Sequence, residues 1–329
     1  MAILVCGGAG YIGSHTVHQL VNQGEEVVIV DNLQTGHRSA LNSKAKFYKG
    51  DIRNPEVLDK IFTENDIEAV IHFAANSLVG ESMKKPLLYF NNNVYGMQIL
   101  LESMVKYKVD KIVFSSTAAT YGEPERVPIL ETDRTLPTNT YGETKLTMEK
   151  MMKWVSLADG VRYISLRYFN AAGAIEDGSI GEDHHPETHL IPLILQVPLG
   201  KRDHITIFGD DYDTPDGTCL RDYIHVLDLA EAHILALEHL RKGGESNIFN
   251  LGSGKGFSVK EMIETAKKVT GKNIKVEIGE RRSGDPAKLV ASAEKAHHIL
   301  GWIPKFDDVE IIIKTAWTWH VNHPNGYMD

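Results

Sequence analysis

The stretch that decides the fold is "AILVCGGAGYIGSH", residues 2–15. Its first five residues, Ala2–Cys6, form an apolar run that predicts a buried strand, and the stretch "YIGSHTVHQLVNQG" carries apolar residues at helical spacing. Three glycines stand between the two patterns: Gly7, Gly10 and Gly13. A turn without side chains lets backbone N–H groups and the positive end of a helix approach a pyrophosphate. This context of strand, turn and helix predicts a dinucleotide-binding turn.

The first half of the chain repeats this alternation of strand and helix. Apolar, β-branched runs at Val27–Val30, Ala69–Ala74 and Lys111–Ser116 predict further buried strands, and "RYISLRYFNAAG" from Arg162 predicts one more. Between them, stretches such as "PLLYFNNNVYGMQILLESMVKYK" have helical spacing. Nearly continuous apolar strands are expected where helices cover both faces of a sheet. The fold class predicted is therefore α/β, with a doubly wound parallel sheet.

From about Gly173 onward the pattern loosens. The segment 175–188 is rich in Gly, Asp, Glu and His, which predicts a loop, and later helices at Leu227–Leu240 and Val259–Val269 alternate with short strands. We predict a Rossmann-like, NAD-binding domain over residues 1–172, to which a segment of about 226–255 returns. A smaller mixed α/β lobe, discontinuous with the sheet domain, is expected over most of residues 173–329.

Composition excludes several classes of protein. The formal charge of -9 argues against non-specific binding to nucleic acid and against docking on anionic membranes. No apolar run approaches the length of about 20 residues that spans a bilayer. Cys6 and Cys219 lie far apart in sequence, which supports neither a disulfide framework nor a zinc site. A reduced, cytoplasmic setting is expected.

Acidic residues follow two of the predicted strands. Asp31 lies 18 residues beyond Gly13, where a carboxylate can accept hydrogen bonds from an adenosine ribose and repel a 2′-phosphate, which favours NAD over NADP. A turn-forming aspartate at a strand end is the alternative, and the nearby Arg38 leaves NADP open. Asp51 and Ile52 in "GDIRN" are placed to flank an adenine, although a plain turn explains them almost as well.

Three polar side chains are expected to meet at the carboxyl edge of the sheet. Thr117 follows the strand at 111–116, and Tyr141 and Lys145 in "YGETK" lie four residues apart on one face of the next helix. A free tyrosine has a pKa of ~10 and is a poor base at neutral pH. A neighbouring ammonium and a positive nicotinamide ring favour the phenolate, so we expect the pKa of Tyr141 to be lowered.

These motifs together resemble the extended short-chain dehydrogenase/reductase superfamily. The strings "GGAGYIGSH", "DNLQTGHRS", "LRYFNAAGA", "FGDDYDTPDGT" and "RRSGDPA" narrow the resemblance to the UDP-glucose 4-epimerase (UDP-galactose 4-epimerase) family, along essentially the whole chain. The resemblance implies reversible 4-epimerisation of UDP-glucose and UDP-galactose in galactose metabolism. It also implies tightly bound NAD that transiently oxidises sugar C4, and a homodimer.

Roles and contacts are carried over from the same resemblance. Tyr141 would take the proton from the sugar 4-OH, Thr117 would hydrogen-bond to the same oxygen, and Lys145 would bond to the nicotinamide ribose. The implied cofactor-binding residues are Gly7, Gly10, Tyr11, Ile12, Gly13, Asp31, Asn32, Asp51, Ile52, Phe73, Ala74, Asn92, Tyr141, Lys145 and Phe169. The implied substrate-binding residues are Thr117, Tyr141, Asn170, His189, Leu190, Phe208, Arg221, Tyr223, Arg282, Asp285 and Leu289.

Three positions depart from the family pattern. Ser77 stands where many members carry a lysine near the cofactor phosphates, and His189 stands where an asparagine is common beside the diphosphate. Leu289 matches a wall position that governs the room for a 2-N-acetyl group. Leucine is smaller than tyrosine, so the use of UDP-N-acetylhexosamines stays open.

Several alternatives remain beside this interpretation. The same chemistry would serve UDP-glucuronate or UDP-pentoses. A nucleotide-sugar dehydratase needs an Asp-Glu pair after the hydroxyl residue, where this chain has Ala118 and Ala119. A non-catalytic NAD sensor would not need the Tyr–Lys pair. His184, His185 and His189 form a histidine cluster, but no acid or thiol has ligand spacing beside them, so no metal is expected.

Overall fold

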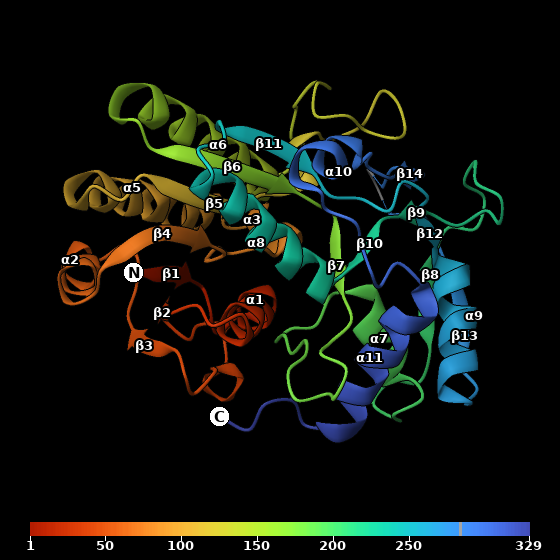
Figure 1. The fold of residues 1–329 in the computed structure, drawn as a ribbon. Coiled ribbons are helices and arrows are strands. Elements are labelled where there is room, and N and C mark those ends of the chain that lie inside the picture. Colours follow the sequence, from red (N-terminus) through yellow and green to blue (C-terminus); the bar gives the residue numbers. More distant parts are fainter. Residues whose placement is uncertain (283–284) are drawn as a thin grey trace.

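The computed structural model describes residues 1–282 and 285–329. Its centre is a seven-stranded sheet in the order β11-β6-β5-β4-β1-β2-β3 (Figure 1). Every neighbouring pair in this sheet is parallel. The strands are β1 (Ala2–Cys6), β2 (Val27–Asp31), β3 (Lys46–Lys49), β4 (Ile67–His72), β5 (Lys111–Ser115), β6 (Arg162–Arg167) and β11 (Asn247–Asn250). The prediction of a doubly wound α/β fold is confirmed.

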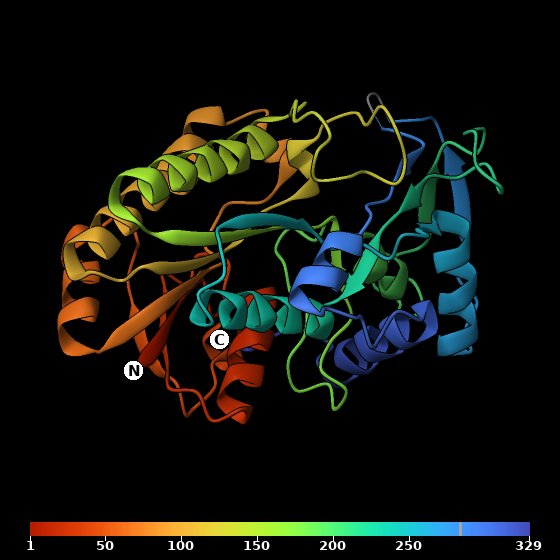
Figure 2. The same cartoon turned by 45° about the horizontal axis from the view of Figure 1, so that its top comes forward.

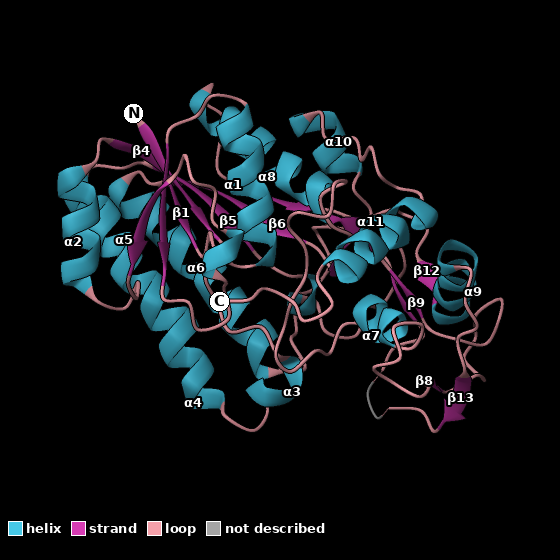
Figure 3. Ribbon diagram, turned by 90° about the horizontal axis from the view of Figure 1, so that it is seen from below, coloured by secondary structure: helices cyan, strands magenta, loops and turns pink. Residues whose placement is uncertain are grey.

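Helices cover both faces of this sheet. One face packs against α1 (Tyr11–Asn22), α8 (Val226–Arg241) and α10 (Glu294–Leu300). The other face packs against α2 (Pro55–Glu64), α5 (Gly96–Tyr107) and α6 (Thr140–Asp159). Figure 3 shows α1 and α8 on one side of the strands and α5 and α6 on the other. Side chains of β1 alternate between the two cores, with Ile3 and Val5 in one and Leu4 and Cys6 in the other.

A smaller part of the molecule, on the right of Figure 2, has its own apolar core. Its strands form two parallel pairs and one three-stranded sheet: β7 (Asn170–Ala172) with β10 (Tyr223–His225), β8 (Ile205–Phe208) with β13 (Val276–Gly279), and β9 (Leu220–Arg221) between β12 (Phe257–Ser258) and β14 (Lys288–Leu289). Its helices are α7 (Leu190–Gln196), α9 (Val259–Thr270) and α11 (Val309–Asn322). Between β10 and β12 the chain returns to the large sheet, because α8 packs on α1 and β11 pairs with β6.

Short elements complete the edge of the sheet that faces this smaller part. They are the helical turns η1 (Arg38–Ala40) and η3 (Ala118–Thr120), the short helices α3 (Val79–Ser82) and α4 (Pro86–Tyr89), and the π-helix η2 (Phe90–Tyr95). In η2, the buried Asn93 donates a hydrogen bond to Thr144 Oγ1 (3.0 Å) and accepts one from the Asn76 amide (2.8 Å). The first bond joins η2 to α6, and the second joins η2 to the segment that follows β4.

Side-chain caps fix where the elements of this edge begin. Asn139 accepts a hydrogen bond from the Gly142 amide and starts α6, so that Tyr141 falls in its first turn. Thr117 accepts from the Ala119 amide and starts η3 directly after β5. No helix in the described parts of the chain is long and apolar enough to cross a membrane.

Candidate active site

A cleft of about 1220 Å³ lies between the carboxyl edge of the large sheet and the smaller part of the molecule. The glycine turn after β1 lines one end, and Arg221, Arg282 and Leu289 line the other. Sites for one drug-sized ligand usually measure about 300–1,000 Å³. The cleft therefore has room for two ligands placed end to end.

The glycine turn fits a group bound very close to the backbone. Gly7 has a φ of 81°, and a Cβ there would lie 2.6 Å from the Ala74 amide nitrogen. A Cβ on Gly13 would lie 2.1 Å from the Gly7 carbonyl oxygen. At Gly10, by contrast, a Cβ would lie 3.4 Å from the Gly7 carbonyl oxygen, an ordinary van der Waals contact, and Gly10 lines the cleft. The turn thus presents bare backbone at the start of α1, as a pyrophosphate requires.

Asp31, at the end of β2, is bound to the backbone on both sides. Its Oδ2 accepts from the Ala9 amide (3.0 Å) and its Oδ1 accepts from the Leu33 amide (2.8 Å). Burial raises the pKa of this carboxyl, although the two amide hydrogen bonds oppose the shift. A carboxylate has about four lone-pair sites, so both oxygens can accept further hydrogen bonds from the cleft.

Asp51 and Arg38, two further charged residues named in the sequence, lie in different settings. Asp51 pairs with Arg53 at 2.6 Å and accepts from Asn32 at 3.3 Å, and the bond with Arg53 lowers its pKa to about 2 despite partial burial. The Arg38 guanidinium lies over the Phe47 ring, 5.9 Å from its centre, and does not line the cleft.

Thr117, Tyr141 and Lys145 meet in the cleft, as the sequence predicts. The buried Lys145 Nζ donates to the Ser115 carbonyl oxygen (2.7 Å) and lies 5.9 Å from the centre of the Tyr141 ring. Burial lowers the pKa of Lys145 to about 7, and the charge of Glu149 opposes this shift. Burial raises the pKa of the largely buried Tyr141 to about 12, and a hydrogen bond with Thr117 opposes that shift.

The expectation that Lys145 lowers the pKa of Tyr141 is wrong for the protein's own groups. Burial dominates at both residues because the phenol and the amine share one enclosed site. Lys145 also lies over the Phe114 ring, at 4.8 Å. Burial therefore favours the neutral form of both groups, and additional positive charge in the cleft is needed to favour the phenolate.

A buried ion pair beneath this site was missed in the sequence. Arg167 on β6 donates through Nε to Glu149 on α6 (2.9 Å), and Ser116 Oγ donates to the same carboxylate oxygen (2.5 Å). The three residues join β5, β6 and α6 directly behind Lys145. Nothing in the local sequence marks Glu149, since a glutamate four residues after a lysine is ordinary on a helix surface.

At the other end of the cleft, arginines dominate. Arg221 on β9 pairs with Asp285 at 2.9 Å, and the Arg282 guanidinium lies 4.1 Å from the centre of the Phe208 ring. Asn170 on β7 donates to the Asp222 carbonyl oxygen (2.8 Å). Ser283 and Gly284, in the "RRSGDPA" string, lie outside the described residues.

The cleft brings together most of the predicted site residues. Those that line it are Gly7, Gly10, Tyr11, Ile12, Gly13, Asp31, Asn32, Asp51, Ile52, Phe73, Ala74, Asn92, Thr117, Tyr141, Lys145, Phe169, Asn170, His189, Arg221, Arg282, Asp285 and Leu289. Leu190, Phe208 and Tyr223 are not among its lining residues. Leu190 and Tyr223 pack in the core of the smaller part, and the Phe208 ring lies under Arg282. Ser77 also lines the cleft, and so does Lys84, a cation that sequence reasoning missed.

The loop before α7 corrects one prediction. Glu182, His184, Glu187 and His189 place one ligand atom each within 4.8 Å of one another, so the statement that no acid has ligand spacing beside the histidines was wrong. Burial lowers the pKa of His189, but the facing carboxylates of Glu182 and Glu187 outweigh it and raise that pKa to about 9. His185, the third histidine, is exposed and faces Asp183 instead.

Comparison with known proteins agrees with this geometry. Residues 3–252 match the family described as "NAD dependent epimerase/dehydratase family". The chain belongs to this family. Within the family it is 63% identical over 327 residues to the UDP-glucose 4-epimerase of Halalkalibacterium halodurans, covering 99% of this chain and 98% of that one. It is 59% identical to the UDP-glucose 4-epimerase of Lacticaseibacillus casei, covering 100% and 99%.

Solved structures from the family have the same fold. One titled as a crystal structure of UDP-glucose 4-epimerase superposes with a TM-score of 0.99 at 60% identity and covers 100% of both chains. Another, UDP-glucose 4-epimerase from Bifidobacterium longum in complex with NAD+ and UDP, has a TM-score of 0.93 at 40% identity and covers 99% of this chain and 100% of that one.

Proposed function

We propose that this protein catalyses the reversible 4-epimerisation of UDP-glucose and UDP-galactose with tightly bound NAD, as a step of galactose metabolism. One observation carries the proposal: Thr117, Tyr141 and Lys145 share a single cleft with the glycine turn and with Arg221 and Arg282. Relatives named UDP-glucose 4-epimerase, up to 63% identical over nearly the full chain, support it.

The residues at the sheet edge fit NAD. The bare backbone at Gly7, Gly10 and Gly13 suits the pyrophosphate, and the free lone pairs of Asp31 suit the adenosine ribose. A 2′-phosphate would face the Asp31 carboxylate, and the Arg38 guanidinium lies outside the cleft. When bound, NAD would accept a hydride from sugar C4, return it, and add a positive charge beside Tyr141.

Tyr141 and Thr117 handle the proton. Tyr141 takes the proton of the sugar 4-OH as C4 is oxidised and returns it when C4 is reduced, and the Thr117 hydroxyl hydrogen-bonds to the reacting oxygen. Lys145 is held by the Ser115 carbonyl oxygen with its ammonium beside the Tyr141 ring, so its charge favours the phenolate whenever it is protonated. Lys145 therefore makes Tyr141, which is otherwise a weak base, a better proton acceptor.

Epimerisation also needs an anchor that keeps the nucleotide in place while the ketone turns. Arg221, Arg282, Asn170 and His189 provide cationic or polar groups around the far end of the cleft for the diphosphate. We propose a division of labour on this basis. Residues 1–172 with about 226–255 bind NAD, and the rest of 173–329 binds the nucleotide sugar.

The direct test is to incubate the purified protein with UDP-galactose and no added NAD, and to separate the nucleotide sugars. We expect UDP-glucose to form without net release of NADH, because the cofactor is oxidised and reduced within one turnover. A product at the oxidation level of the ketone, with one NADH per sugar, would instead indicate a dehydrogenase.

We propose that the cleft also accepts a second substrate class. Leu289 lines the cleft and is smaller than tyrosine, which favours acceptance of UDP-N-acetylhexosamines. The Leu289→Tyr variant should lose activity on UDP-N-acetylgalactosamine and keep activity on UDP-galactose. Equal loss on both sugars would remove Leu289 from this role.

The oligomeric state and the cellular location are proposed from separate observations. Trp154 and Leu157 on α6 and Leu87 on the neighbouring α4 are 68%, 70% and 81% exposed, and we propose that they meet a second copy in a homodimer. A mass measured by light scattering should be twice that of the chain and should fall to the mass of one chain in Trp154→Glu.

Both cysteines are free and buried, which supports a location in the reducing cytoplasm.

A further inference from the structure

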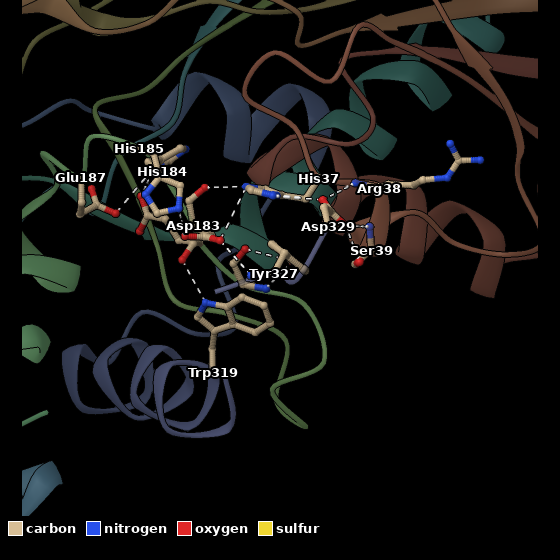
Figure 4. A network of polar contacts seen from close by, with 12 residues as sticks. His37, Arg38, Ser39, Asp183, His184, His185, Glu187, Trp319, Tyr327 and Asp329 are labelled. Carbon is tan, nitrogen blue, oxygen red and sulfur yellow. Dashed lines mark hydrogen bonds and ion pairs between the residues drawn. The ribbon is translucent and has the colours of Figure 1, made fainter. Parts of the chain in front are cut away.

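A cluster of metal-binding side chains lies on the loop before α7, outside the groups that handle the hydride and the proton. Glu182, His184, Glu187 and His189 come from a single stretch of eight residues. Figure 4 shows His184 and Glu187 turned toward each other. Two carboxylates and two imidazoles make a mixed nitrogen and oxygen donor set, of which only His189 also has a part in the proposed function.

One ligand atom from each of the four residues lies within 4.8 Å of the others, which is within reach of a tetrahedral arrangement. His184 Nδ1 lies 3.3 Å from Glu182 Oε1 and 3.9 Å from Glu187 Oε2. His189 Nδ1 lies 3.9 Å from Glu187 Oε1 and hydrogen-bonds to Glu182 Oε1. Bonds of about 2.0–2.1 Å to Zn²⁺ place tetrahedral ligands about 3.4 Å apart. Adjustments of about an ångström or less at each side chain would bring the four donors to this geometry.

The loop is held in place by groups outside the cluster. The Trp319 indole of α11 donates to the Glu182 carbonyl oxygen (3.0 Å), and the Tyr327 amide donates to Asp183 Oδ2 (2.9 Å). His37 donates to the Asp183 carbonyl oxygen (3.0 Å) (Figure 4). Glu187 Oε1 accepts from the amides of Thr188 and His189, both at 2.7 Å. The Glu182 side chain is only 5% exposed. Donors with fixed backbones and supporting hydrogen bonds are what a protein metal site requires.

We propose that these four residues bind one Zn²⁺ ion as a structural site that fixes the shape of this loop. Imidazole and carboxylate together suit Zn²⁺, whereas Mg²⁺ and Ca²⁺ prefer oxygen ligands alone. Four protein ligands fill a tetrahedron and leave no open position, so the ion has no part in the chemistry at Tyr141. His184 and His189 line the cleft, so the ion fixes part of its wall.

The test is a titration of the EDTA-treated and dialysed protein with Zn²⁺, followed by calorimetry. Co²⁺ serves as a second probe because it absorbs visible light strongly in a tetrahedral site. We expect one ion per chain, with an affinity that falls at least about 100-fold in His184→Ala and in Glu187→Gln, in line with the loss of a ligand. The matched control is His185→Ala. This neighbouring histidine is 79% exposed and faces Asp183 Oδ1 at 3.4 Å, and its removal should leave the affinity unchanged.

Three outcomes would overturn the proposal. They are the absence of saturable Zn²⁺ binding in the wild type, the same affinity in the His184→Ala/Glu187→Gln double variant, and equal loss in His185→Ala. Circular dichroism and the melting temperature of each variant show whether it is folded, and the less buried His184 can be judged alone if Glu187→Gln unfolds. The readout is ion binding, so the result is independent of whether UDP-galactose is epimerised.

Discussion

The two ends of the cleft are built in different ways. At the glycine end, the functional groups sit where strands of the large sheet stop: Gly7 after β1, Asp31 at the end of β2 and Thr117 just after β5. The order of the sheet places the ends of β1 and β2 side by side and the end of β5 beyond β4, all at one edge. At the arginine end, Arg221 and Leu289 belong to strands of two residues each, and His189 ends a long loop.

This difference shows what holds each end in position. Hydrogen bonds between parallel strands fix the glycine end, and each strand carries its own signal in the sequence. The arginine end depends on contacts with residues that lie far along the chain. His37 and Tyr327 stack at 4.7 Å, and both bond to Asp183 (Figure 4). We expect changes at the glycine end to affect the chemistry and cofactor binding. We expect changes at the arginine end to affect the shape of the cleft wall.

The largest effect is expected from Tyr141→Phe. Removal of the phenol removes the proton acceptor, and general-base contributions are typically about 10²–10⁴-fold, so the epimerisation rate should fall by that factor. NAD should stay bound, as measured by cofactor released on denaturation. Tyr168→Phe is the control, because its hydroxyl bonds to Ser115 Oγ in the same region. A retained rate in Tyr141→Phe would remove Tyr141 from its role.

Asp31→Ala should loosen the cofactor without touching the reacting groups. A hydrogen bond to a charged group contributes about 1.5–3 kcal/mol, so NAD affinity should fall roughly 10- to 100-fold. Cofactor content after gel filtration measures this. In Asp31→Asn, the amide oxygen can still accept a hydrogen bond from the Ala9 or the Leu33 amide. This variant therefore separates the loss of the ribose contact from the loss of the hydrogen bonds that hold the turn. Unchanged content in both variants would contradict a ribose contact.

Sequence reasoning succeeded where structure is local. β1 was predicted with its observed bounds, and β2, β5 and α8 within one residue at each end, because apolar runs and helical spacing report directly on strands and helices. The place of Thr117, Tyr141 and Lys145 at one edge follows from those elements and from the rule that open α/β sheets bind ligands at their carboxyl ends.

It failed where position depends on distant partners or on burial. Glu182 and Glu187 stand in the same short stretch as the histidines, but only the fold shows that their side chains converge, since the Glu182 backbone is held by Trp319, 137 residues away. Among the protein's own groups, burial raises the pKa of Tyr141, which the sequence could not show because it places Lys145 nearby without showing how deeply both groups are buried. Tyr223 was carried over to the cleft although it packs into a core.

Acid should destabilise the fold through its buried, neutral histidines. Burial lowers the pKa of His72 to about 3 and that of His233 to about 4, below the ordinary value of 6.5 that applies in the unfolded chain. Their contribution to stability is therefore fully present above pH 6.5 and is lost as the pH falls toward 4. Between pH 7 and 5.5 the loss is about 1 kcal/mol for each histidine. Urea unfolding at the two pH values measures it, and His233→Gln should reduce the difference. A wild-type stability that rises toward pH 5.5 would contradict neutral burial.

The smallest effect is expected at Asp329, which connects the arginine end of the cleft to the segment 37–39 beside the glycine turn. Asp329 accepts from the amides of Arg38 (2.7 Å) and Ser39 (2.8 Å), and the His37 amide donates to the Ala9 carbonyl oxygen (2.9 Å) in the glycine turn. Asp329→Asn removes the charge and weakens these bonds by about 0.5–1 kcal/mol, so NAD should dissociate about two- to fivefold faster. Asp307→Asn, at an exposed position, is the control. If neither variant changes the dissociation rate of NAD, the Asp329 contact does not influence cofactor binding at the glycine end. It then only positions the last residues of the chain.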